Sequence, residues 1–328
     1  MTLMVALTAC GGTAGTDAGT DSGNGGTDGG GGGTDGGGGD TDGGGPEPLP
    51  TLRAWDGSNM VAADLSCLGM LTAPAAGADT TYPVRIVARG VADEIAPNRI
   101  FRIYTDNVVP TDDSCGANCI ELTADGTGMQ SVMLPADAWI AYQVIENAGA
   151  PGATLTTLQI NKATAMSDFN GSGTDPGEAL ELSAITGAIF SSALGAANIM
   201  RQEGTVIFTG TTRDCAGNEL IGAEARVFGA GGQIMSGRDR TGPRIVYWND
   251  DGPAGLLPSP SRTFTSNQGR YAGANLPSGG TLRVEIWAVT TDGAQPSRIG
   301  CEEIAAIDNS VYVLDVGPTR MDGPTACR

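Results

Sequence analysis

The chain has 328 residues, a formal charge of −19 and 52 glycines, but no histidine. Without histidine it lacks the commonest general base and the Ser–His and Cys–His pairs of many nucleophilic hydrolases. The negative charge repels phosphate backbones, so we expect no nucleic-acid partner.

The first ten residues form a short apolar segment that ends in Leu7, Thr8, Ala9 and Cys10. This ending resembles the lipobox of bacterial lipoprotein signal peptides, in which the cysteine is lipidated and becomes the first residue after cleavage. The resemblance implies a signal peptide over residues 1–10 and a membrane anchor at Cys10. Gly11 follows the cysteine, which is similar to lipoproteins sorted to the outer membrane. We expect a lipid-anchored protein on the periplasmic or cell-surface side.

The segment before Cys10 is shorter and less basic than a complete signal peptide. Signal peptides combine a basic start with about 7–15 apolar residues. Here no Lys or Arg precedes Arg53. We therefore expect the coding sequence to begin upstream of Met1. The alternative is a chance apolar start of a cytosolic protein.

Residues 11–50 consist mainly of Gly, Thr, Asp and Ser. Such a segment buries too little apolar surface to offset the entropy lost on ordering, so we predict a disordered linker. A Gly-rich chain of about forty residues spans roughly 35 Å on average. Behind a lipidated cysteine, this linker would hold a folded head away from the membrane.

Residues 51–166 show the pattern of a first β-sandwich. Apolar residues recur at period two in residues 84–88, 100–104, 139–144 and 155–160, and turn residues separate these segments. This pattern is typical of half-buried strands. Similar segments follow in the same order in residues 203–328, so we interpret the two stretches as a duplication of one fold.

The connecting segment, residues 167–202, contains two patterns. It starts with the oxygen-bearing side chains of a calcium loop, Asp168, Asn170, Ser172 and Asp175. The twelfth position of the loop is Ala179 instead of a bidentate Glu, so the alternative is a polar turn that caps a helix. Apolar residues three and four apart then predict an amphipathic helix over about 178–200. This helix would lie on one sandwich or bridge the two.

Residues 203–328 carry the second set of alternating segments. They resemble the carboxypeptidase regulatory-like (transthyretin-like) β-sandwich family at Gly210, Asp214, Gly217, Leu220, Gly222, Ala223, Thr265, Gly269, Tyr271, Leu276, Pro277 and Gly279. Residues 231–261 are an insertion relative to that pattern. The resemblance implies a structural or binding accessory domain without catalytic residues of its own.

Six cysteines remain beyond Cys10, an even number that suits disulfides in an oxidising compartment. Cys115 and Cys119 are close in sequence, and we predict a local disulfide between them rather than a metal or redox site. For the other four we favour the pairs Cys215–Cys301 and Cys67–Cys327. Six cysteines allow fifteen connectivities, so the spacing leaves alternatives open.

An aromatic residue followed by amides and carboxylates is a combination that stacks on a sugar and bonds its hydroxyls. The inserted segment has this combination at Tyr247, Trp248, Asn249 and Asp250. The alternative is that Trp248 packs under its own loop. Adjacent carboxylates, such as Glu302 and Glu303, could serve glycoside hydrolysis but are typical of solvated surface.

Together these patterns predict an all-β protein of two tandem transthyretin-like or Ig-like sandwiches joined by one helix. We expect a non-enzymatic, lipid-anchored envelope protein that binds a polysaccharide or another envelope protein. The alternative is a carboxylate-based extracellular hydrolase acting on glycans. Calcium is the one cofactor that the sequence suggests.

Overall fold

The computed structural model describes residues 48–70, 81–90, 95–112, 114–135, 138–146, 155–164, 179–185, 187–250, 257–318 and 327. Residues from Leu49 onward form one compact unit. Cys10, the linker up to residue 47 and the four calcium-loop residues, Asp168, Asn170, Ser172 and Asp175, lie outside the described residues.

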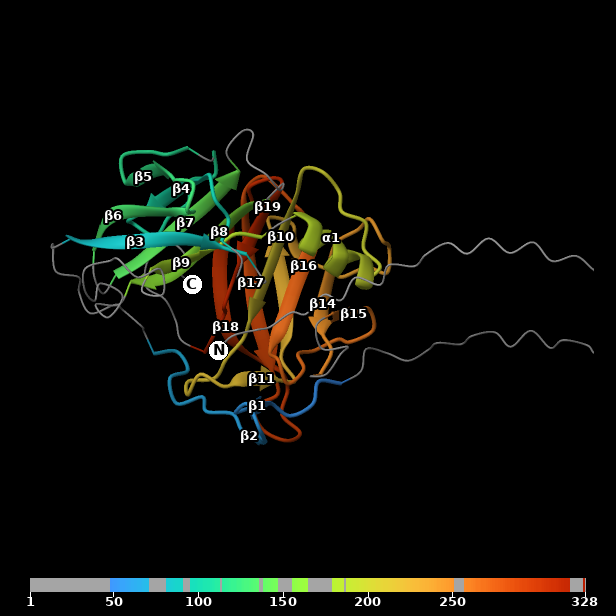
Figure 1. Cartoon of the computed structure of the whole chain (residues 1–328). Coiled ribbons are helices and arrows are strands. Elements are labelled where there is room, and N and C mark those ends of the chain that lie inside the picture. Colours follow the sequence, from blue (N-terminus) through green and yellow to red (C-terminus); the bar gives the residue numbers. More distant parts are fainter. Residues whose placement is uncertain are drawn as a thin grey trace, which may run out of the picture. The chain divides into compact units, whose positions relative to one another are not determined.

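A nine-stranded sheet runs through both halves of this unit. Its order is β15-β14-β16-β10-β19-β8-β7-β4-β5 (Figure 1). In that order the strands are Pro258–Ser259, Arg244–Trp248, Arg270–Pro277, Thr205–Thr211, Ser310–Val313, Thr156–Thr164, Ala138–Glu146, Arg99–Tyr104 and Cys119–Thr123.

Three smaller sheets and one helix complete the described structure. The four-stranded sheet is β13 (Gly232–Ile234), β12 (Glu224–Gly229), β17 (Thr281–Ala288) and β18 (Ser297–Ala305). The second sheet is β6 (Met129–Pro135), β3 (Thr81–Arg89) and β9 (Leu180–Ser183). The third is β11 (Glu219–Ile221), β1 (Arg53–Trp55) and β2 (Met60–Ala62), and the helix is α1 (Gly187–Ala196).

Alternating side chains of the large sheet build a core on each of its faces. On β10, Val206 and Phe208 pack with Val284 of β17, so the four-stranded sheet covers one face. Ile207, between them, packs with Phe190 of α1 on the opposite face. On that opposite face, the sheet β6-β3-β9 covers β4 and β7 through a separate apolar cluster.

The two halves repeat one topology. The order β6-β3-β9 of the first half matches β16-β10-β19 of the second, and β5-β4-β7-β8 matches β13-β12-β17-β18. The last strand runs parallel to the first in both halves, as β9 beside β3 and β19 beside β10. The prediction of an all-β protein built from tandem β-sandwiches is therefore confirmed.

The predicted helix over 178–200 is wrong in its first part. Residues Leu180–Ser183 form β9, in which Leu180 and Leu182 are buried while Glu181 is exposed. Parallel pairing with β3 satisfies the backbone hydrogen-bonding groups of this strand, so the helix begins only at Gly187. In the first half the equivalent of β19 is thus β9, whereas residues 156–160 belong to β8.

Other strands differ from the prediction either in their position or in the strand they pair with. The stretch 231–261, expected as an insertion, contains β13, β14 and β15, and Cys301 lies in β18. Strands β1 and β2 fall within the range expected for the first sandwich, yet β1 pairs with β11 of the second.

Three disulfides join the six cysteines. Cys115 and Cys119 are bonded, which confirms the local pairing. The other two predicted pairs are wrong, because the bonds are Cys67–Cys215 and Cys301–Cys327. The pairing of β1 with β11 brings the segment after β2 to the turn that holds Cys215, where the Cys215 amide donates to the Asp64 carbonyl at 2.9 Å.

Candidate functional site

Tyr247 is a core residue rather than part of a ligand site. Its ring is buried in the cluster between the large sheet and the four-stranded sheet. Its hydroxyl accepts a hydrogen bond from the Ala225 amide at 2.9 Å, and burial raises its pKa well above the usual range. The sugar-stacking motif therefore loses its first aromatic residue.

The other residues of the motif make contacts within the protein. Trp248 is half-buried and packs against the apolar cluster that contains α1. The Asn249 carbonyl accepts from Gln268 Nε2 at 2.9 Å. Asp250 pairs with Arg262 at 2.7 Å. These contacts support the packing interpretation for most of the motif and leave part of Trp248 and the Asp250 carboxylate accessible.

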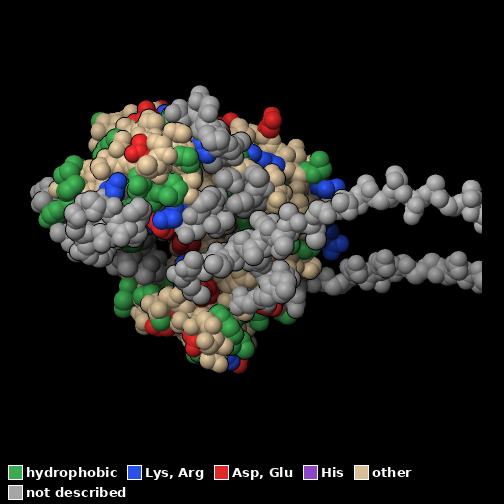
Figure 2. Space-filling model, in the orientation of Figure 1, with side chains coloured by type: hydrophobic (Ala, Val, Ile, Leu, Met, Phe, Trp, Pro, Cys, Tyr) green, Lys and Arg blue, Asp and Glu red, His purple; other side chains and the backbone are tan. Residues whose placement is uncertain are grey.

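A basic loop, residues 236–245, lies next to this motif and was missed in the sequence. It includes Arg238, Arg240 and Arg244, and Arg201 joins it from the segment after α1. Figure 2 shows basic side chains at the edge of the molecule beside α1. The signal in the sequence was three arginines within seven residues of a strongly acidic chain.

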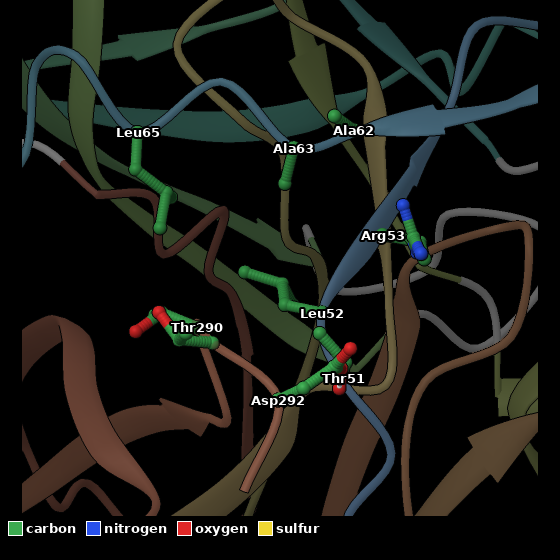
Figure 3. Close-up of a pocket in the computed structure, with 9 residues that line it drawn as sticks. Thr51, Leu52, Arg53, Ala62, Ala63, Leu65, Thr290 and Asp292 are labelled. Carbon is green, nitrogen blue, oxygen red and sulfur yellow. Dashed lines mark hydrogen bonds between the residues drawn. The ribbon is translucent and has the colours of Figure 1, made fainter. Parts of the chain in front are cut away.

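A small pocket of about 230 Å³ opens where β1 meets the loop after β17 (Figure 3). Leu52, Ala63 and Leu65 form its apolar wall. On the polar side, the Thr51 hydroxyl donates a hydrogen bond to the Asp292 carboxylate. Asp292 is the one carboxylate among the residues that line this pocket, so the pocket lacks the pair of carboxyls that glycoside hydrolysis needs.

The adjacent carboxylates singled out in the sequence do not form a catalytic pair. Glu302 and Glu303 point to opposite faces of β18, and Glu302 is buried in the core. Burial raises the pKa of Glu302 to about 7, against a smaller opposing effect of a hydrogen bond from the Asn161 side chain. Two other adjacent carboxylate pairs occur in the sequence, Asp112–Asp113 and Asp250–Asp251, and the second residue of each lies outside the described residues.

Neither a metal cluster nor a membrane span appears in the part of the chain that the structure describes. No group of three or more His, Cys, Asp or Glu side chains is placed there to hold a metal ion. Within the same ranges, no helix is both long and apolar enough to cross a membrane.

Comparisons with known proteins give matches among solved structures alone. No protein-family model matches the chain, and no curated protein does. The shaft pilin SpaA from Lactobacillus rhamnosus GG is 16% identical with a TM-score of 0.23, and the match covers 75% of this chain and 99% of that one. The minor pilin of Streptococcus agalactiae is 11% identical, with a TM-score of 0.19 and coverages of 75% and 99%.

The Bacillus anthracis TIE protein is 14% identical, with a TM-score of 0.20. That match covers 72% of this chain and spans 34% of the length of the TIE protein.

Proposed function

We propose that the chain is a non-enzymatic, lipid-anchored protein of the bacterial cell envelope, whose two β-sandwiches form a binding or structural head. The anchor is Cys10, the linker is residues 11–50, and the lipid holds the protein at the outer membrane. The head binds a polysaccharide or another envelope protein.

The distribution of the cysteines carries this proposal. The chain has seven cysteines, and six of them form three disulfides with one another. Structural disulfides of this kind persist in oxidising compartments outside the cytoplasm. Cys10 is the seventh, so it has no partner left within the chain, and it ends the lipobox-like segment. A cysteine in that position is suited to lipidation.

The experiment is expression of the complete gene, with its upstream codons, in a Gram-negative host. We expect mass spectrometry to find the mature chain beginning at Cys10 with lipid on it, and the protein to fractionate with the outer membrane. A Cys10→Ser variant should leave that fraction while its head keeps all three disulfides. Unmodified Cys10 in a soluble cytosolic chain would overturn the proposal.

A further inference from the structure

The basic loop stands out in charge from the rest of the protein. The chain carries a net charge of −19, yet Arg201, Arg238, Arg240 and Arg244 gather here. Among the described residues, none of these four forms an ion pair, whereas seven other arginines do. Guanidinium groups without a carboxylate partner remain available to an anion from outside.

Hydrogen bonds at its base hold the loop in one conformation. The Gly237 amide donates to the Pro243 carbonyl at 3.0 Å, and the Ile245 amide donates to Ser236 Oγ at 3.0 Å. At the tip, the carboxylate of Asp239 accepts from the Thr241 amide at 3.1 Å. The one acidic side chain of the loop is therefore engaged in its turn, and Arg238 and Arg240 are exposed on either side.

Asn275 of β16 fixes the loop to the segment that carries Arg201. Its side-chain nitrogen donates to the carbonyls of Met200 at 2.9 Å and Thr241 at 3.2 Å, while its oxygen accepts from the Gln202 amide at 2.9 Å. The Met200 amide also donates to the Arg240 carbonyl at 2.8 Å. Arginines that are about forty residues apart in sequence thus lie on adjoining backbone segments.

One guanidinium nitrogen is left unsatisfied at this place. Arg201 Nε is buried and has no hydrogen-bond partner among the described residues. A buried donor without a partner is unfavourable, so an acceptor supplied by a ligand would stabilise it. Arg244 is buried as well and donates to the Arg238 carbonyl at 3.4 Å, a contact that positions both residues.

We propose that the basic loop binds an acidic polysaccharide, through carboxylate or sulfate groups carried on successive sugars. Arginine forks bind such groups in a bidentate manner. Trp248, on the same strand as Arg244, is partly exposed near the loop, so one sugar ring would contact its exposed edge while a neighbouring sugar carries its charged group to the exposed Arg238 and Arg240. A nucleic acid fits less well, because its dense charge is repelled by the acidic remainder of the chain. The choice of a polysaccharide rests on the proposed function.

The experiment is a binding titration of the full chain in detergent, with polygalacturonate as the anionic probe. The same polymer with its carboxylates methyl-esterified is the neutral probe, and duplex DNA is the alternative polyanion. We expect binding to polygalacturonate that weakens as salt is raised, with no binding to the ester. The double variant Arg238→Gln, Arg240→Gln should weaken binding roughly tenfold or more.

The matched control is Arg102→Gln, Arg213→Gln, which changes the net charge equally but alters surface ion pairs outside the loop. It should bind like the unmodified chain. Equal weakening in both double variants, equal binding of the ester, tighter binding of DNA, or no binding of polygalacturonate would each overturn the proposal. The outcome is independent of lipidation, because it is measured on purified protein whatever the state of Cys10.

Discussion

In the second sandwich, the residues that carry the family resemblance fix the geometry of the backbone. The Asp214 carboxylate accepts from the Asn218 amide at 2.9 Å and so closes the turn after β10. A side chain at Gly210 would collide with the Leu314 carbonyl, and the Tyr271 hydroxyl donates to that same carbonyl at 2.8 Å. These requirements are local or belong to a recurring turn pattern, and for that reason they could be found in the sequence.

The residues of the candidate site could not be predicted in the same way. Composition singled out Tyr247 and Trp248 together, but successive strand residues point to opposite faces, and Tyr247 turns toward the core. The position of Arg201 beside Arg240 depends on Asn275, a contact between distant parts of the chain that leaves no periodic signal.

Glu302 is an acidic side chain held inside the apolar core. It lies near Asn161 and Asp315. Burial raises the pKa of Tyr271 well above its usual range, and the charge of Glu302 adds to that shift. One carboxyl oxygen, Oε2, has no hydrogen-bond partner among the described residues. Because burial raises the folded-state pKa from 4.5 to about 7, the folded protein keeps a proton that the unfolded chain releases between these values.

We predict that the free energy of unfolding falls as the pH rises from about 4.5 to 7 and that Glu302→Gln removes this dependence. The variant should be more stable than the unmodified protein above pH 7, by up to about 3 kcal/mol. Urea unfolding of the unmodified protein and the variant at pH 5 and pH 8 would measure these free energies. The control is Glu303→Gln, on the opposite face of β18. A stability difference that is the same at the two pH values would contradict the prediction.

At the scale of elements, period-two alternation located most of the long strands but not their partners. It found β3, β10 and β17, where the sequence alternates clearly, although some of these strands bury side chains on both faces. It failed for β9, because Leu182 is three residues before Ile185 and the segment leads directly into a helix, so a helical period also fits it. Strands of three residues, such as β1 and β2, are too short to show any period, and they exist because β1 pairs with β11.

The disulfides should differ in their effect on stability. Cys67–Cys215 closes a loop with a sequence separation of 148, whereas that of Cys115–Cys119 is 4. From loop-closure entropy we expect the first disulfide to stabilise the folded state by roughly 5 kcal/mol and the second by about 2 kcal/mol. We predict that replacing both members of Cys67–Cys215 with Ala lowers the midpoint of urea unfolding more than the same change at Cys115–Cys119. Equal losses would contradict this reasoning.

At the scale of the whole described unit, the two sandwiches share one sheet. Strands β8 and β19 pair in parallel, with Leu158 opposite Tyr312. The apolar cluster of the second half also includes Tyr104, Ala141 and Leu158 from the first half. The alternating pattern predicted two sandwiches, but it could not predict this junction, since a strand has the same pattern whether or not its edge is paired.

We predict that the two sandwiches unfold together. Leu158 is fully buried at the junction, and Leu158→Ala should cost about 2–5 kcal/mol. Calorimetry should show one transition that moves to lower temperature as a whole. Leu134→Ala, in the core of the first sandwich alone, should move the same single transition. Two separate transitions, of which each variant shifts only one, would refute the joint unfolding.

The bond between Cys67 and Cys215 also determines how the head responds to mechanical load. A pull on Leu49 would peel away β1 and β2, but it could extend the chain only as far as Cys67. There the disulfide would pass the tension to the turn after β10, an inner strand of the large sheet that is paired on both edges. If the protein is anchored through residues 1–50 as proposed, a pull on the head would first release this short segment and then be opposed by the disulfide.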